Sequence, residues 1–133
     1  MRKLLAICMV ALTLGGCAQL QAARTALELG TVSVANPVTP ERLYQIESTV
    51  SLVFVGLNTW KKSCIAGLIP ESCKQQIRTV QIYTMQIPPY LKELRKFVRT
   101  NDQVNAAVVF NQLTDIIGIV RGQAASAGQS LGS

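Results

Sequence analysis

Apolar residues recur at alternating intervals of three and four positions from Leu43 onward, which is the spacing of one helix face. The sequence Thr39-Pro40-Glu41 precedes this pattern and is typical of a helix start, with a capping hydroxyl, a first-turn proline and an early acidic residue. Gly67 follows the last apolar position and is typical of a helix end. We therefore predict a first helix from Pro40 to about Gly67. Its apolar positions are Leu43, Ile46, Val50, Val53, Leu57, Trp60 and Cys64.

The same spacing predicts a second helix, which starts near Pro70 or Ser72 and ends near Thr100. Residues 72–75 match the S-x-x-Q pattern of a capping box. Pro88-Pro89 interrupts the helix, so we expect a kink or a break there. The apolar phase continues unchanged through the prolines, which favours one bent helix or two stacked segments that share a face. The apolar positions are Ile77, Val80, Thr84, Ile87, Leu91, Leu94 and Val98.

A third helix is expected from Gln103 to about Gly122, and a short connection separates it from the second. Long amphipathic helices with short connections pack as antiparallel neighbours. The expected fold is therefore all-α, a three-helix up-down-up bundle over residues 40–123. Three apolar faces of similar length bury one another, so a monomer is favoured. The apolar positions of the third helix are Ala106, Val109, Leu113, Ile116 and Val120.

The residues on either side of the bundle lack a long periodic pattern. Residues 17–39 are rich in small and polar residues and contain Asn36-Pro37, which is typical of a flexible tether. A short amphipathic stretch within it, residues 18–29, is a candidate helix. Residues 124–133 consist mainly of Ala, Ser, Gly and Gln, which predicts a disordered tail.

The first residues of the chain form a pattern typical of an export signal. Arg2 and Lys3 precede an apolar run of eleven residues, Leu4 to Leu14, that only Thr13 interrupts. The run is shorter than the roughly 20 apolar residues of a membrane-spanning helix. It fits the apolar region of a signal peptide. An ordinary secretory signal with a chance cysteine, or a short buried helix, would show the same run.

The sequence Leu14, Gly15, Gly16 and Cys17 at the end of this run resembles the lipobox of bacterial lipoproteins. The resemblance implies that signal peptidase II removes residues 1–16 and that the Cys17 thiol is diacylated. Several acyl chains hold a protein on a membrane far more firmly than one chain does. Enterobacterial lipoproteins with Asp after the cysteine stay at the inner membrane. Ala18 stands there in this chain, which favours the periplasmic face of the outer membrane.

The composition excludes several kinds of active site. The chain has 133 residues, four cysteines and no histidine. This length allows one small domain. Without histidine, His-based triads, a His general base and His-containing metal sites are excluded. The chain also lacks the common nucleophile and phosphate-loop motifs. We therefore expect no catalytic residue, no cofactor and no metal site.

Two cysteines remain for the body of the protein once Cys8 leaves with the signal and Cys17 carries lipid. Cys64 and Cys73 form an even pair in an exported, oxidising setting, which predicts a disulfide near the tip of the first helical hairpin. Two thiols without a histidine make a poor zinc site. Two independent buried thiols are the alternative.

The chain has 13 basic and 7 acidic residues, a net charge of +6. Two basic clusters are candidates for contact with a phosphorylated glycolipid, anionic headgroups or an acidic envelope protein. Alternatively, these side chains only complement the negative ends of helices. Nucleic acid is not expected as a partner in an exported compartment. The clusters are Lys61, Lys62, Lys74 and Arg78 near the cysteine pair, and Lys92, Arg95, Lys96 and Arg99 farther along the second helix.

The body also resembles small uncharacterised exported proteins of alphaproteobacteria and their phages. The resemblance rests on Asn36-Pro37-Val38-Thr39, Leu43-Tyr44 and the pair Cys64 and Cys73. It implies an envelope location and no known activity. We expect a non-enzymatic, membrane-anchored structural or interaction module. One alternative is a lysis accessory similar to phage outer-membrane spanin subunits, which pair with an inner-membrane partner. The other is a small envelope hydrolase inhibitor.

Overall fold

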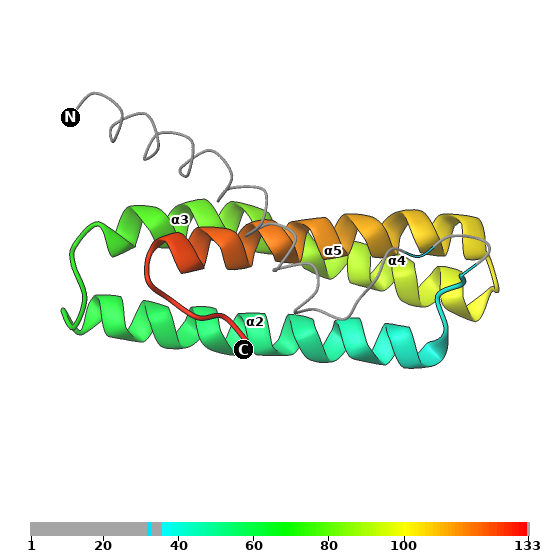
Figure 1. Cartoon of the computed structure of the whole chain (residues 1–133), viewed down its shortest axis with the longest axis horizontal. Helices are drawn as coiled ribbons and strands as arrows, with labels where there is room; N and C mark the ends of the chain where they lie inside the picture. Colours follow the sequence, from blue (N-terminus) through cyan, green and yellow to red (C-terminus); the bar gives the residue numbers. More distant parts are fainter. Residues whose placement is uncertain (1–31, 33–35, 133) are drawn as a thin grey trace, which may run out of the picture.

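The computed structural model describes residue 32 and residues 36–132 (Figure 1). The expected signal segment 1–16, the lipobox with Cys17, the candidate helix 18–29 and most of the expected tether lie outside the described residues. Four helices make up the described part of the chain: α2 (Pro40–Ile65), α3 (Cys73–Thr84), α4 (Ile87–Arg99) and α5 (Gln103–Ser126). In Figure 1, α3 and α4 follow one another back along α2, and α5 then reverses direction again. The all-α class predicted from the sequence is confirmed.

Side chains cap the two longest helices at their N-termini. The Thr39 hydroxyl accepts a hydrogen bond from the Arg42 backbone N–H at 3.3 Å, at the start of α2. The Asp102 carboxylate accepts one from the Asn105 N–H at 3.2 Å, at the start of α5. Each bond satisfies a backbone donor that has no partner inside the helix. The pKa of Glu41 is lowered by hydrogen bonds to its own backbone N–H and, second, to the Thr39 hydroxyl.

The start of α3 differs from the capping box that the sequence predicts. Ser72 has helical backbone angles (φ −56°, ψ −18°), and its side chain makes no capping hydrogen bond. Backbone hydrogen bonds close the turn instead, from the Cys73 N–H to the Pro70 carbonyl at 3.0 Å and from the Gln76 N–H to the Ser72 carbonyl at 3.2 Å. The S-x-x-Q pattern is therefore fortuitous here, because Ser72 does not adopt the extended angles of a side-chain cap.

The second predicted helix is divided at Met85 and Gln86, just before the two prolines. Pro88 and Pro89 have no N–H, so the carbonyls of Thr84 and Met85 lack their helical donors. The prolines occupy the first turn of α4, where backbone donors have no intrahelical partner in any helix. Met85 (φ −64°, ψ −21°) and Gln86 (φ −81°, ψ −21°) keep right-handed helical angles. The chain therefore continues in register, as two segments that share one buried face.

One hydrophobic core connects all four described helices. The apolar positions predicted from the sequence are buried, except Leu43 and Val98, which are half-buried against the core. Trp60 and Phe110 are the largest of its buried side chains. Thr84 is the buried polar residue of the described chain, and its hydroxyl donates to the Gln81 carbonyl at 3.1 Å. Burial of apolar surface, at roughly 25 cal/mol per Å², is the main stabilising contribution to this fold.

Helix α5 has an apolar composition as well as a place in the core. By length and composition it is the described helix that could cross a membrane, with 44% of its most apolar window buried inside the body. Core helices of globular proteins meet the same criterion. Phe110 and Ile117 of α5 are fully buried by the neighbouring elements, as the residues of a core helix are.

Two residues of the predicted tether belong to the packed body. Val32 and Val38 are almost completely buried. The Asn111 side chain on α5 accepts a hydrogen bond from the Val32 N–H at 3.3 Å and donates one to the Val32 carbonyl at 3.1 Å. The Gln103 side chain accepts one from the Val38 N–H at 3.0 Å. A tether would leave these backbone groups to water, so Val32 and Val38 are part of the body rather than of a tether.

The predicted disordered tail is wrong for the residues up to 132. Helix α5 continues to Ser126, and the following residues return to α2 (Figure 1). Leu131 is 4% exposed, and a Cβ atom built on Gly56 would lie 3.0 Å from its Cδ2 atom. The Arg121 Nη2 atom donates to the Gly132 carbonyl at 2.6 Å. The tail is ordered because the glycine in the middle of α2 lets Leu131 approach the helix backbone closely.

Candidate functional site

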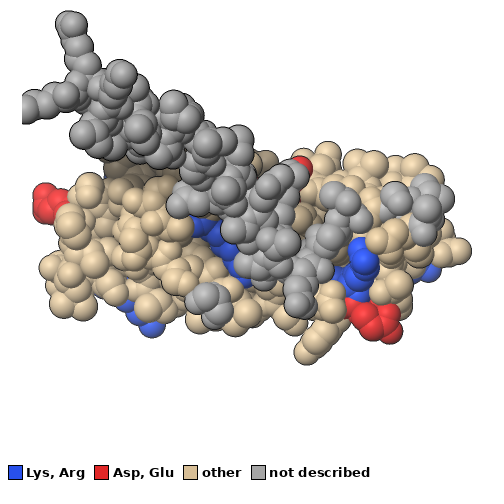
Figure 2. Space-filling model, in the orientation of Figure 1, with Lys and Arg blue, Asp and Glu red and all other residues tan. Residues whose placement is uncertain are grey.

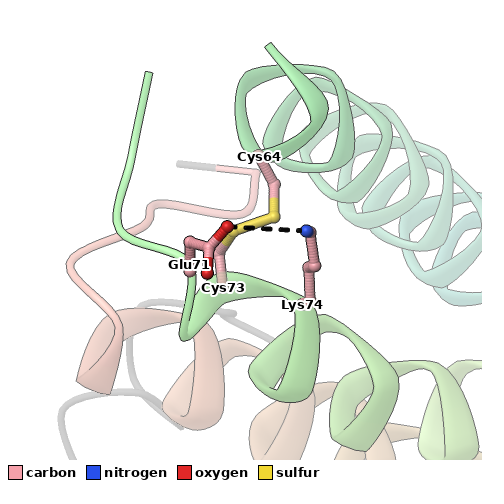
Figure 3. Close-up of a disulfide and its surroundings, with 4 residues drawn as sticks. All are labelled: Cys64, Glu71, Cys73 and Lys74. Atoms are coloured by element: carbon pink, nitrogen blue, oxygen red, sulfur yellow. Dashed lines mark ion pairs between the residues drawn. A yellow bond between two sulfur atoms is a disulfide. The ribbon is translucent and has the colours of Figure 1, made fainter. Parts of the chain in front are cut away.

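The pair Cys64 and Cys73 joins the end of α2 to the start of α3 (Figure 3). Their sulfur atoms are at bonding distance, and their Cα atoms are 6.0 Å apart, as the sequence predicts for a disulfide. Both residues are buried, so the bond is part of the core at this end of the body. The nine-residue separation makes the turn between the helices a closed loop.

The first basic cluster surrounds this turn. Lys61 is half-buried, whereas Lys62, Lys74 and Arg78 are exposed. Lys74 forms an ion pair with Glu71 at 3.9 Å, and both side chains are largely exposed (Figure 3). An exposed pair at this distance contributes little to stability. The cluster is therefore available to an anionic partner.

The second basic cluster forms a stripe along α4. Lys92, Arg95, Lys96 and Arg99 are all exposed, and their spacing of three and four residues places them on one side of the helix. The Arg95 Nε atom lies 2.5 Å from the Glu47 Oε1 atom of α2. Arg95 therefore joins α2 to α4.

The cations of this stripe therefore differ in whether they form an ion pair with a carboxylate. Within the described residues, no ion pair holds Lys92, Lys96 or Arg99 to a carboxylate. These three side chains are the anion-binding candidates of α4, and Arg95 is in part a structural residue.

The two clusters do not merge into one basic surface. The first adjoins the turn between α2 and α3, and the second lies on α4 toward the turn before α5. Figure 2 shows basic side chains in separate small areas, on a face that is mostly neither basic nor acidic. The sequence between Arg78 and Lys92 contains no Lys or Arg, so no cation of this segment links the two clusters. Small anionic groups or a locally acidic surface fit such separate clusters.

An open groove, which sequence reasoning missed, lies between α2 and the break that separates α3 from α4. Its volume is about 510 Å³. Lys61 supplies its positive charge, and the lining contains no carboxylate. The interruption at Pro88-Pro89, close to Met85, was the available sequence signal. The lining residues are Phe54, Leu57, Asn58, Lys61, Gln81, Thr84, Met85 and Pro88.

The part of the chain that the structure describes presents no candidate metal centre. It contains no group of three or more His, Cys, Asp or Glu side chains that could hold a metal ion. Three buried nitrogen atoms lack a hydrogen-bond partner there: Arg42 Nη1, Trp60 Nε1 and Arg121 Nε. Burial lowers the pKa of Arg121, because desolvation disfavours its charged form. Arg42 and Trp60 lie on α2 and Arg121 lies on α5, and none of the three lines the groove.

Comparison with known proteins assigns no function to the basic clusters or to the groove. No family model, curated protein or solved structure matches the chain.

Proposed function

We propose that the chain is a bacterial lipoprotein that holds a helical interaction module on a membrane. The observation that carries this proposal is the sequence Leu14-Gly15-Gly16-Cys17, directly after a basic pair and an eleven-residue apolar run. Signal peptidase II removes residues 1–16, and Cys17 carries the acyl chains. The periplasmic face of the outer membrane is favoured over the inner membrane.

The folded body is proposed to be a self-contained up-down-up bundle, with α3 and α4 together as its second arm. Each of the three apolar faces is buried within one chain, which supports a monomer over an intermolecular coiled coil. The chain between Cys17 and Val32 spans at most roughly 50 Å when extended. The bundle therefore works within about this distance of the bilayer.

The module is proposed to act by binding rather than by catalysis. Its exposed cations, in two separate clusters, are suited to an acidic envelope protein or to anionic glycolipid headgroups. The spanin-like alternative requires an apolar seam that is free for a partner helix. The burial of the seams supports the interaction module over that alternative.

Replacement of the lipidated residue tests the anchor. Cys17→Ser removes the thiol that forms the thioether, so we expect loss of palmitate labelling and of the processed, membrane-bound form. Cys8→Ser is the matched control, because Cys8 lies in the segment that cleavage removes, and it is expected to leave labelling unchanged. The measurement is labelling with radioactive palmitate in cells, followed by membrane fractionation. Unchanged labelling of Cys17→Ser would contradict the proposal.

A further inference from the structure

The turn between the two bonded cysteines is unusually apolar for an exposed loop. It reads Ile65-Ala66-Gly67-Leu68-Ile69-Pro70 before its first polar residue. Ile65 is 85% exposed and Leu68 is 76% exposed. Surface turns in water are usually polar, and neighbouring exposed apolar side chains mark an interaction site. The described body therefore displays two large aliphatic side chains at one end.

The backbone holds these side chains outward. Gly67 adopts φ +70°, a left-handed conformation that suits glycine at a helix end. The Leu68 N–H donates to the Ser63 carbonyl at 3.0 Å. The disulfide closes the turn, and Ile69 packs against the core. Leu68 and Ile65 are thus presented by a constrained loop whose remaining aliphatic residue is already used for packing.

Basic side chains flank the apolar turn on both sides. Lys61 and Lys62 belong to the end of α2, and Lys74 and Arg78 belong to the first turns of α3. Glu71 is the single acidic residue of the sequence from 61 to 78, and Lys74 forms an ion pair with it. An apolar tip with cations on the two adjoining helix ends matches the interface of an anionic bilayer, where acyl chains lie beneath negative headgroups.

We propose that the turn between Cys64 and Cys73 is a second membrane contact, which inserts Ile65 and Leu68 into the interface of an anionic phospholipid bilayer. Lys62 and Lys74 then lie at the level of the headgroup phosphates. This contact is separate from the proposed Cys17 anchor and does not depend on acylation. It orients the bundle with the end of α2 and the start of α3 toward the bilayer.

Tryptophan at position 68 provides a local probe of this contact. The full-length Leu68→Trp chain is reconstituted with phosphatidylglycerol vesicles, and the vesicle-bound fraction is isolated by flotation. We expect a blue-shifted emission, quenching by brominated phosphatidylglycerol and protection from aqueous iodide. Trp60 is buried, so the wild-type chain supplies the background. Val55→Trp is the matched control, because Val55 is 62% exposed on α2 outside the turn, and it is expected to stay open to iodide.

Charge-reversing substitutions and apolar-to-polar substitutions separate the electrostatic contribution to vesicle binding from the apolar contribution. In the Leu68→Trp chain, Lys62→Glu with Lys74→Glu is expected to reduce the quenching, whereas Lys62→Arg with Lys74→Arg, which keeps both positive charges, is not. High salt is expected to act like the first pair. Ile65→Ser in the Leu68→Trp chain is expected to weaken partitioning of the turn, measured by the same quenching, by about tenfold, the factor associated with one exposed aliphatic side chain.

Three outcomes would overturn the proposal. The first is equal iodide access at positions 68 and 55 on phosphatidylglycerol vesicles. The second is protection from iodide without quenching by brominated lipid, which would indicate a second copy or another protein on the turn. The third is failure of the chain to float with anionic vesicles. A chain that retains Cys17 but carries no acyl group, with quenching at position 68 as expected, would contradict the anchor alone, so the two proposals fail separately.

Discussion

Val53→Asp is expected to unfold the helical body. Val53 lies in the middle of α2 and is 0% exposed. The substitution places a carboxylate among apolar side chains, where neither water nor a cation can compensate its charge. An uncompensated buried charge costs on the order of 3–5 kcal/mol. That is a large fraction of the roughly 5–15 kcal/mol that stabilises a typical small domain. Circular dichroism should show loss of most helical signal or a strongly lowered melting temperature.

The same substitution two residues farther along α2 is a matched control. Val55 is exposed, so Val55→Asp is expected to change stability by less than about 0.5 kcal/mol. Sedimentation measurements on Val53→Asp distinguish the two arrangements of the seam. An oligomer that dissociates while the monomer keeps its helicity would contradict the intramolecular bundle and would favour the spanin-like alternative.

Removal of the disulfide is the second change with a large expected effect. Cys64→Ala with Cys73→Ala opens a loop of about ten residues in the unfolded chain, which costs roughly 2–3 kcal/mol in the chain-entropy model. For a domain of this size we expect the melting temperature to fall by roughly 10–20 °C. The expected change also includes a small loss of packing, because both cysteines are buried.

Thermal unfolding with and without reductant separates the bond from the packing. The wild-type chain in reductant should melt close to the double variant, and the double variant should not respond to reductant. Peptide mapping without reduction should show residues 64 and 73 linked. Two free thiols in periplasmic material, with a melting temperature that reductant does not change, would contradict the disulfide.

The buried faces of the helices were predictable because they depend on a local period. Ile46, Leu94 and Leu113 lie on three different helices, and each follows from the spacing of its own neighbours. The position of the break was also close to the expectation, because proline removes a backbone donor wherever it stands. The conformation of Ser72 was not predictable in this way, because the adjacent turn and its disulfide decide it.

No comparable local pattern in the sequence predicts how the two ends of the body pack. Leu131 is buried against Gly56, and Val32 pairs with Asn111, so each contact joins residues that are far apart in sequence. Composition alone indicates flexibility for both segments. Gly56 in the middle of a predicted helix was the one clue, since glycine there often permits a close approach of another chain segment.

At the candidate site, too, local spacing predicts some features, whereas others depend on contacts between residues that are far apart in sequence. Helical spacing predicts that Lys92, Lys96 and Arg99 share a face, and the structure confirms their exposure. The engagement of Arg95 by Glu47 depends on how α2 and α4 pack, so spacing could not reveal it. The exposure of Leu68 likewise depends on which of the aliphatic residues in the turn reaches the core.

Mass spectrometry of the N-terminal peptide of the membrane-extracted protein decides whether Cys17 is the lipid anchor. We expect a chain that begins at Cys17 and carries a diacylglyceryl group on the Cys17 sulfur atom. A membrane-extracted chain that retains residues 1–16, or that begins elsewhere with an unmodified Cys17 thiol, would contradict it.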